Sequence, residues 1–328
     1  MSASLPISQA PSSPSDAAPA TAPAAVPAVS PVADLIDLPT GKELNEVSAN
    51  RFAASRPVRL IVLAGPVDCG KTTLLTSLYE LFQLNSVAGQ NFAGSITLPA
   101  FEQRCHLART ASENVTSDTQ RTVYKGPDPY YLHLRTTAIE PPHTSVDFLF
   151  TDVSGEMFEH ARNSTAECKE LTFLQRATHF LLLLDGEKGV RAERWAMVQN
   201  SRTMLQSCID TKMLPNFCVV NVVWAKQDYF EAAPDADKKE HLAFREEVIR
   251  QFRASFEHRV SHLKFSAVAA RPKQAPRLGF GNGVPKLLTD WIVHCPQSGK
   301  MDLQLRGRAG TRESELFALR HFANVQKP

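Results

Sequence analysis

The fold is decided by the stretch Gly65-Pro66-Val67-Asp68-Cys69-Gly70-Lys71-Thr72. It has the form G-x-x-x-x-G-K-[ST], in which glycines let the backbone wrap closely around phosphate groups while successive N–H groups point at the anion. An apolar run at residues 60–63 precedes the loop, and a helical pattern of leucines begins at Leu74. A strand, a glycine-rich loop and the positive end of a helix together predict a phosphate-binding site.

Two side chains of this loop have chemical roles of their own. Lys71 is expected to reach the terminal phosphates and to act in catalysis, and the hydroxyl of Thr72 is expected to hold Mg²⁺. The other residues would surround the phosphates through their backbone. The predicted nucleotide-binding residues of this stretch are Gly65, Pro66, Val67, Asp68, Cys69, Gly70, Lys71, Thr72 and Thr73.

Composition limits the class of protein. The chain has 328 residues, 43% hydrophobic and 21% charged, with a net charge of +2, which suits one sizeable α/β domain with extensions and gives no overall attraction to nucleic acid or anionic membranes. No apolar run approaches the roughly 18 residues of a membrane span. The six cysteines form no C-x-x-C pair, so we expect free thiols and a reducing, cytoplasmic location.

Three regions follow from the distribution of residue types. Residues 1–55 are Ala/Pro/Ser-rich with no Lys or Arg before Lys42, which predicts a disordered tail that lacks the features of a signal or transit peptide. Residues 56–295 carry the folded domain. Residues 296–328 are a polar extension in which 313–322 suits either a terminal helix or more tail.

Within the domain, apolar strands alternate with amphipathic helices. Strands are expected at 58–64, 130–137, 146–151, 178–184, 217–223 and 263–267, with the second and third as an antiparallel hairpin. This alternation predicts an α/β, three-layer domain with a mostly parallel sheet and helices on both faces. Ligands bind such sheets beyond the carboxyl ends of the strands. Residues 87–129 form a long insertion suited to a first nucleotide switch, and residues 153–176 suit a second.

A second motif, Asp152-Val153-Ser154-Gly155, ends an apolar strand. The carboxylate of Asp152 can hold Mg²⁺ through water, opposite Thr72. The N–H of Gly155 can approach the terminal phosphate. The motif is weak alone and gains weight because it follows a phosphate-binding loop.

A third motif, Lys226-Gln227-Asp228, also ends an apolar strand. The carboxylate of Asp228 can accept hydrogen bonds from the N1–H and 2-amino groups of guanine, which adenine lacks, while the stem of Lys226 lies along the base. Ser266-Ala267, at the end of a later strand, then matches the short element whose backbone N–H reads the guanine O6.

In this order the motifs resemble those of P-loop GTPases of the translation-factor/Ras-like (TRAFAC) class, over about residues 56–293. The resemblance implies a P-loop NTPase G domain that binds GTP or GDP with Mg²⁺. Residues 92–95 and 101–104, together with the Asp152-Val153-Ser154-Gly155-Glu156 version of the second motif, further resemble the double-GTPase-like proteins of bacterial conflict systems. That implies a protein partner, such as another GTPase contacting the switch regions, in a signalling or defence system.

Two positions depart from the class. Ala225 stands where an Asn or Thr usually ties the base loop to the phosphate loop, and Glu156 stands where Ras-like proteins place a water-orienting Gln. A carboxylate beside the terminal phosphate repels it unless a cation compensates, so we expect slow hydrolysis.

Three further roles stay open. The first-switch threonine, catalytic and metal-binding by resemblance, is assigned to Thr122 first, then to Thr119 and Thr116. Asp68 either helps to bind a monovalent cation or faces solvent. Arginines that flank the switches supply either an intrinsic arginine finger or surface contacts: Arg104, Arg109, Arg121 and Arg176.

The residues leave three functions to separate. The first is a GTP-binding switch with slow, Mg²⁺-dependent hydrolysis by water, in which case the chain is an enzyme. The second is a GTP-binding scaffold or heterodimer subunit without useful turnover, which Ala225 and Glu156 favour. The third, an ATPase or small-molecule kinase, conflicts with Asp228 and Ser266.

Overall fold

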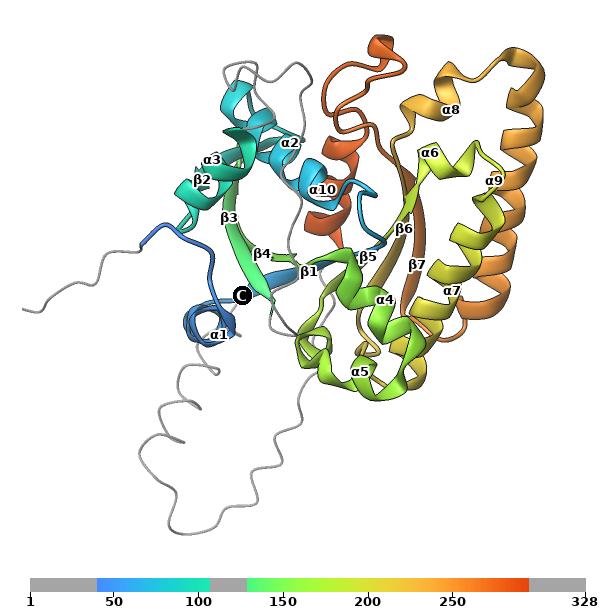
Figure 1. Ribbon diagram of the computed structural model, residues 1–328. Helices are drawn as coiled ribbons and strands as arrows, with labels where there is room; N and C mark the ends of the chain where they lie inside the picture. The colour runs from blue at the N-terminus through green and yellow to red at the C-terminus, as the bar shows by residue number, and fades with distance from the viewer. Residues whose placement is uncertain (1–39, 107–128, 295–328) are drawn as a thin grey trace, which may run out of the picture. The chain divides into compact units, whose positions relative to one another are not determined.

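A computed structural model describes residues 40–106 and 129–294 of the chain. In these residues a single sheet has the strand order β2-β3-β4-β1-β5-β6-β7 (Figure 1). The strands are β1 (Val58–Ala64), β2 (Gln90–Gly94), β3 (Tyr130–Ala138), β4 (Ser145–Asp152), β5 (His179–Asp185), β6 (Val219–Ala225) and β7 (His262–Ala267). β2, β3 and β4 pair antiparallel, and the other neighbours pair parallel. The expected strands, the hairpin and the mostly parallel sheet are confirmed.

Helices cover both faces of the sheet. Their bounds are α1 (Glu46–Ser55), α2 (Lys71–Leu84), α3 (Leu98–His106), α4 (Gly155–Asn163), α5 (Thr165–Glu170), α6 (Gly186–Gly189), α7 (Arg194–Asp210), α8 (Asp228–Ala232), α9 (Asp235–Phe256) and α10 (Val284–Val293), with 3₁₀ turns η2 (Thr172–Arg176) and η3 (Pro276–Leu278). Buried side chains of α2, α3 and α10 pack on one face, and those of α1, α4, α5, α7 and α9 pack on the other. The predicted three-layer α/β arrangement is confirmed.

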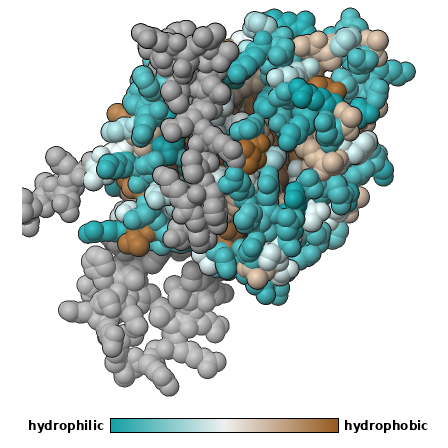
Figure 2. Space-filling view, in the orientation of Figure 1, coloured by the Kyte–Doolittle hydropathy of each residue, from teal (hydrophilic) through white to brown (hydrophobic). Residues whose placement is uncertain are grey.

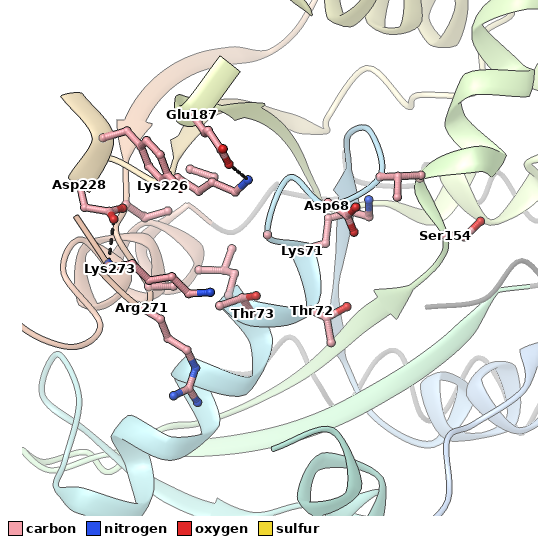
Figure 3. Close-up of a pocket in the computed structure, with 18 of the residues that line it drawn as sticks. Asp68, Lys71, Thr72, Thr73, Ser154, Glu187, Lys226, Asp228, Arg271 and Lys273 are labelled. Atoms are coloured by element: carbon pink, nitrogen blue, oxygen red, sulfur yellow. Dashed lines mark hydrogen bonds and ion pairs between the residues drawn. The ribbon is translucent and has the colours of Figure 1, made fainter. Parts of the chain in front are cut away.

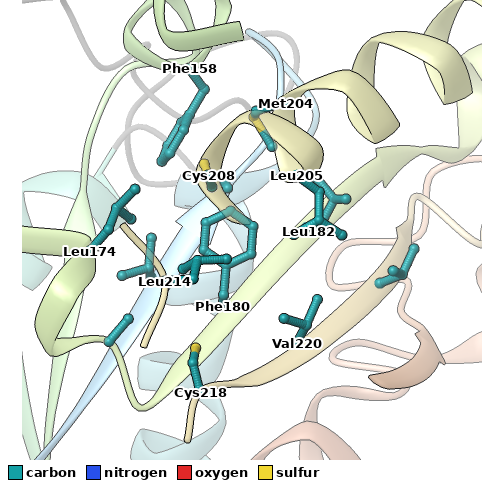
Figure 4. Packing of buried hydrophobic residues seen from close by; sticks show 14 of the residues in the cluster. Phe158, Leu174, Phe180, Leu182, Met204, Leu205, Cys208, Leu214, Cys218 and Val220 are labelled. Atoms are coloured by element: carbon teal, nitrogen blue, oxygen red, sulfur yellow. The ribbon is translucent and has the colours of Figure 1, made fainter. Parts of the chain in front are cut away.

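The core explains why the central strands read as continuous apolar runs. Every residue of β5 and β6 is buried, because helices cover both faces of these strands. Figure 4 shows one side of this core, where Phe158 of α4 and Leu174 of η2 lie with Phe180 of β5, near Cys208 of α7. At the surface, hydrophilic residues predominate over small, separate hydrophobic spots in the face that Figure 2 shows.

The start of the ordered domain was predicted wrongly. Residues 46–55, assigned to the disordered tail, form α1, whose N-terminus is capped by Asn45 accepting from the N–H of Ser48 at 2.9 Å. Helix α1 buries little besides Ala49, and Phe52 stacks edge-on against His133 of β3 at 4.6 Å between ring centroids. So few apolar residues give almost no periodic signal. Residues 1–39 and 295–328 lie outside the described residues.

The first-switch insertion also contains more structure than expected. The edge strand β2 was not predicted, because only Gln90 of its five residues is buried and its register shifts at Gly94. The helical piece expected from Leu98 is confirmed up to His106. In the region suited to a second switch, helices α4 and α5 and the turn η2 lie within residues 155–176.

Candidate functional site

The phosphate loop connects β1 to α2 and is shaped by residues with positive φ. Asp68 and Gly70 adopt φ values of 62° and 98°. Gly65 has a φ of 151°, and a Cβ there would lie 2.9 Å from the carbonyl oxygen of Leu183 on the neighbouring strand β5. Only glycine combines this φ with so close an approach, which fixes the first position of the motif.

Lys71, the first residue of α2, folds back over the loop. Its Nζ donates to the carbonyl oxygens of Gly65 at 2.9 Å and Pro66 at 2.8 Å. The ammonium group therefore lies inside the turn of backbone that the motif predicts to surround phosphates. Cys69 is fully buried beside it, and this burial raises the pKa of its thiol despite the opposing charge of Lys71, so the sulfur stays protonated and acts as packing.

A cavity of about 540 Å³ opens beside this loop. Figure 3 shows its two ends, with Lys71 and Thr72 on one side and Asp228 and Lys226 on the other. Both predicted motifs thus line one space, whose size suits a small-molecule ligand. The lining residues that sequence reasoning predicted are Val67, Asp68, Gly70, Lys71, Thr72, Thr73, Gly155, Lys226 and Asp228.

Gly155, the first residue of α4, touches the phosphate loop directly. A Cβ at this position would lie 2.3 Å from the amide nitrogen of Val67 and 2.5 Å from the carbonyl carbon of Pro66. The second motif is therefore packed backbone against backbone on the first. Glu156 follows as a half-buried residue that is not among the described residues lining the cavity.

Asp152 ends β4 next to this contact, but its carboxylate is held from the side of α3. Oδ2 accepts from Nε of Arg104 at 2.8 Å and also from Nη2 of the same residue. The same Nη2 donates to Oε1 of Glu43 at 2.8 Å. Burial lowers the pKa of Arg104, but the charges and hydrogen bonds of Asp152 and Glu43 outweigh it and raise the pKa overall. Sequence reasoning placed Asp152 correctly at a strand end but missed this partner.

The end of the cavity away from the phosphate loop is built on the turn after β6. Lys226 adopts a φ of 53°, and its Nζ lies 3.0 Å from Oδ2 of Asp185 and 3.1 Å from Oε2 of Glu187. Burial lowers the pKa of Lys226, but the charge of Asp185 and the hydrogen bonds to both carboxylates raise it further than burial lowers it. The lysine is therefore a fixed, charged side chain at the cavity wall.

Asp228 is almost completely buried, with 2% of its surface exposed. Its Oδ2 accepts from the backbone N–H groups of Lys273 at 2.8 Å and Gln274 at 3.0 Å. The loop that follows β7 in the sequence thus supplies two backbone donors to the carboxylate that was predicted to read guanine.

The structure differs from the prediction at Ser266-Ala267. Both residues lie inside β7, where Ser266 Oγ accepts from the amide of Asn221 at 3.2 Å and Ala267 pairs with Trp224. Neither is among the described residues lining the cavity. The wall is formed instead by residues further along, Val268, Ala270, Arg271 and Lys273. The dipeptide was recognised by identity alone, and no signal in the sequence shows that the strand pairing runs past it.

Of the other residues that the sequence analysis singled out, some lie in the described residues and some do not. Ala225 is buried and lines the cavity, and its Cβ would lie 3.9 Å from a Cβ placed at Gly70. Thr116, Thr119 and Thr122 lie outside the described residues, as do Arg109 and Arg121. Arg176 pairs with Glu46 of α1 at 3.0 Å.

The comparisons with known proteins bear on the whole domain. A family model described as Double-GTPase 2 matches residues 59–292. Among curated proteins, no sequence matches this chain. In the described residues, no helix is long and apolar enough to cross a membrane.

Three solved structures that resemble this chain each share 14% sequence identity with it. A bacterial selenocysteine-specific elongation factor EF-Sec is matched over 73% of this chain and 29% of its own, with a TM-score of 0.33. The GTP-bound GTPase-like domain of S. cerevisiae Ski7 is matched over 66% and 44%, with a TM-score of 0.37. Methanosarcina barkeri Roco2 RocCORdC bound to GDP is matched over 74% and 52%, with a TM-score of 0.32. The chain spans less than two thirds of each of these solved chains.

Proposed function

Because the chain belongs to the Double-GTPase 2 family, we propose that it is a GTP-binding molecular switch that hydrolyses GTP slowly with the help of Mg²⁺. The observation that carries this proposal is the single cavity lined by both the phosphate loop and the Lys226–Asp228 turn. A nucleoside phosphate has an anionic end and a base end, and the two ends of the cavity offer matching groups. The base end, with a buried carboxylate acceptor, favours guanine over adenine.

The base would be read by Asp228 and by the loop that follows β7. The carboxylate already accepts from Lys273 and Gln274 through Oδ2, which fixes its position before a ligand arrives. Val268 and Ala270 line the wall at which Ser266-Ala267 was expected, so a backbone N–H of this segment would be the one to read the base. The base would lie along the aliphatic stem of Lys226, whose Nζ is held by Asp185 and Glu187.

The residues present suit Mg²⁺. Hydroxyl and carboxylate oxygens are the donors that this hard cation prefers, and they would come from Thr72, which lines the cavity, and from Asp152, which directly precedes the lining residues Val153 and Ser154. The buried carboxylate of Asp152 is paired with Arg104, so a metal ion at this oxygen would have to displace the guanidinium. Bound there with the nucleotide, the metal would neutralise phosphate charge. A third ligand from the first switch, assigned to Thr122, remains a prediction.

In hydrolysis the protein's own groups mainly hold and stabilise. Lys71, whose ammonium lies inside the phosphate loop, would meet the terminal phosphates, and the N–H of Gly155 would approach them because α4 packs against Val67. Glu156 is not among the described residues lining the cavity, but it directly follows Gly155, and a carboxylate in place of a neutral water-orienting Gln would add negative charge on this side of the nucleotide, in line with slow turnover. Residues 87–129 and 153–176 would change conformation with the nucleotide state.

A second function, GTP binding without useful turnover, is favoured by one specific observation. The methyl side chain of Ala225 cannot hydrogen-bond to the phosphate loop, and its Cβ would lie 3.9 Å from a Cβ placed at Gly70. In either case the family name suggests a partner that is itself a GTPase, in a bacterial signalling or defence system. The five described cysteines are free, which supports a reducing, cytoplasmic setting. Asp68, exposed at the rim, remains the candidate for a monovalent cation.

Nucleotide titration with and without Mg²⁺ tests the proposal. Fluorescent GTP and ATP analogues are titrated against the wild type, Lys71→Ala, Asp228→Asn and the control Lys238→Ala. The control removes a lysine of α9 that forms a surface ion pair with Asp235. We expect GTP to be preferred, Lys71→Ala to weaken binding strongly, and Asp228→Asn to shift the preference to xanthosine triphosphate, because that swap reverses a buried hydrogen-bond pattern. Preference for ATP would refute the proposal.

Phosphate release then separates the two functions. Slow release by the wild type, lost in Lys71→Ala, supports the switch. Tight GTP binding without release, alone and with a partner GTPase, supports the scaffold.

A further inference from the structure

Arg104 joins two carboxylates that lie far apart in the sequence. From α3 it donates through Nε and Nη2 to Asp152 and through Nη2 to Glu43, while Nη1 donates to the carbonyl oxygen of Ala100 at 2.9 Å. Its side chain is 13% exposed, that of Asp152 6% and that of Glu43 26%. The guanidinium is thus shared between a deeply buried acceptor and a more accessible one.

Glu43 is held in place by its neighbours on both sides. Gly41 accepts from the N–H of Ala100 on α3 at 3.1 Å, and Leu44 exchanges two backbone hydrogen bonds with Tyr131 of β3, at 3.0 and 2.8 Å. The segment therefore bridges α3 and the sheet, and the backbone of Glu43 is positioned without Arg104. Its carboxylate is a second acceptor for the same guanidinium.

We propose that Arg104 is an internal cation that competes with Mg²⁺ for Asp152 and moves its hydrogen bonds to Glu43 when the metal site is filled. The inference rests on the proposed function, in which Asp152 is the carboxylate of the metal site. It assigns to Arg104 a positioning role that sets the Mg²⁺ requirement of nucleotide binding, and to Glu43 the role of alternative acceptor.

Electrostatics supports an exchange of Arg104 between Asp152 and Glu43. A divalent cation and a guanidinium repel each other strongly at a shared oxygen in a poorly hydrated site, so full occupancy by both is unfavourable. Arg104 can leave Oδ2 of Asp152 without losing every partner, because Glu43 and the carbonyl of Ala100 remain within reach of the same guanidinium. α3 and the segment before α1 would then report whether the metal site is filled.

The test measures the Mg²⁺ concentration that gives half-maximal stabilisation of the GDP complex, read as melting temperature over a range of Mg²⁺ at saturating GDP. The variants are Arg104→Gln, Arg104→Lys and Glu43→Gln. The control is Arg259→Gln, which removes an arginine from an ion pair with Asp210 of α7, away from the described cavity. Melting temperatures in EDTA without nucleotide show separately how far each variant is destabilised.

Opposite shifts are expected from the two partners of the pair. Arg104→Gln should lower the half-maximal Mg²⁺ concentration roughly 10- to 100-fold, the effect of losing charge-assisted hydrogen bonds to the carboxylate. Arg104→Lys, which keeps the charge but loses the bidentate geometry, should fall between this variant and the wild type. Glu43→Gln should raise the concentration several-fold, because Arg104 then has no second carboxylate. Arg259→Gln should leave it unchanged.

An unchanged or increased Mg²⁺ requirement in Arg104→Gln would overturn the inference, even if that variant melts at a lower temperature. A purely structural role would lower the melting temperature at every Mg²⁺ concentration without moving the midpoint. If wild-type protein gains no stability from GDP at any Mg²⁺ concentration, the proposed function fails as well, so the two failures are distinguishable.

Discussion

Gly155→Ala tests whether the two phosphate-end motifs are packed as the structure shows. Alanine is the better helix former by about 1 kcal/mol, so in a free helix this change at the first residue of α4 would stabilise. Here the added Cβ would lie 2.3 Å from the amide nitrogen of Val67, about 1 Å inside ordinary contact, and 2.5 Å from the carbonyl carbon of Pro66. Both neighbours are backbone atoms, so no side-chain rotation relieves the overlap.

The size of the effect follows from these opposing terms. Overpacking of this kind costs about 1–3 kcal/mol against a helix gain of about 1 kcal/mol, so we expect a net loss of up to about 2 kcal/mol in unfolding free energy without nucleotide. A phosphate loop displaced by about 1 Å also misplaces its N–H donors, and displacements of that size cost on the order of 100-fold where geometry is critical. We therefore expect nucleotide affinity to fall roughly 10- to 100-fold.

Urea unfolding and titration with a fluorescent GDP analogue measure the two effects. Val248→Ala is the control, since it removes buried side-chain atoms from α9, a helix with no residue among the described residues lining the cavity. That variant should lose stability and keep its nucleotide affinity. A Gly155→Ala protein that is as stable as the wild type and binds GDP as tightly would refute the close approach of α4 to the phosphate loop.

Three further predictions concern other parts of the domain. Burial lowers the pKa of His179 to about 3, so as the pH falls below about 6.5 the unfolded chain takes up a proton that the folded chain does not. Stability should therefore fall between about pH 6.5 and pH 3, with the unfolding equilibrium constant rising by up to tenfold per pH unit. Acid unfolding curves of His179→Gln should show a weaker dependence on pH. Ala225→Asn restores a donor facing the phosphate loop and should tighten GDP binding about threefold to tenfold by titration calorimetry, whereas unchanged or weaker binding would count against that contact. Asp185→Ala removes the N-cap of α6 and a partner of Lys226. It should lower the unfolding free energy measured in urea by about 1–2 kcal/mol and weaken nucleotide binding. An unchanged urea midpoint would contradict both roles of Asp185.

The sequence predicts the centre of this molecule well and its edges poorly. β1, the phosphate loop and α2 are read from one motif because buried parallel strands are apolar throughout and the loop needs glycine at defined places. The edge strand β2 and helix α1 give weaker signals, since each buries only one residue fully. Their positions depend on contacts made across the sheet, such as Leu44 with Tyr131, which local patterns do not encode.

The site shows the same limit for side chains that meet across long distances. Asp152 was placed from the end of its strand, but its partner Arg104 lies 48 residues earlier and the shared acceptor Glu43 lies 61 residues before that arginine. Ser266-Ala267 was chosen for its residue types, whereas the hydrogen bond from the N–H of Val268 to the carbonyl of Trp224 at 2.8 Å carries the pairing one residue further. Register, set by the whole sheet, therefore decided which residues face the cavity.

The missing Asn or Thr at position 225 shows how the rest of the site alters the meaning of one substitution. From the sequence, its loss puts the rigidity of the base loop in doubt. In the structure, a Cβ at Gly186 would lie only 2.4 Å from the carbonyl oxygen of Ala225, so the start of α6 packs directly on this loop. The N–H of Gln227 donates to the carbonyl of Val268 at 2.9 Å, and Lys226 is tied to Asp185. Backbone packing against α6 and an ion pair with Asp185 thus hold the base loop. What the alanine at position 225 lacks is a direct hydrogen bond to the phosphate loop. The base end can therefore be rigid on its own while its coupling to the phosphate end is weak, which favours a protein that holds nucleotide well and depends on another element to connect its two ends.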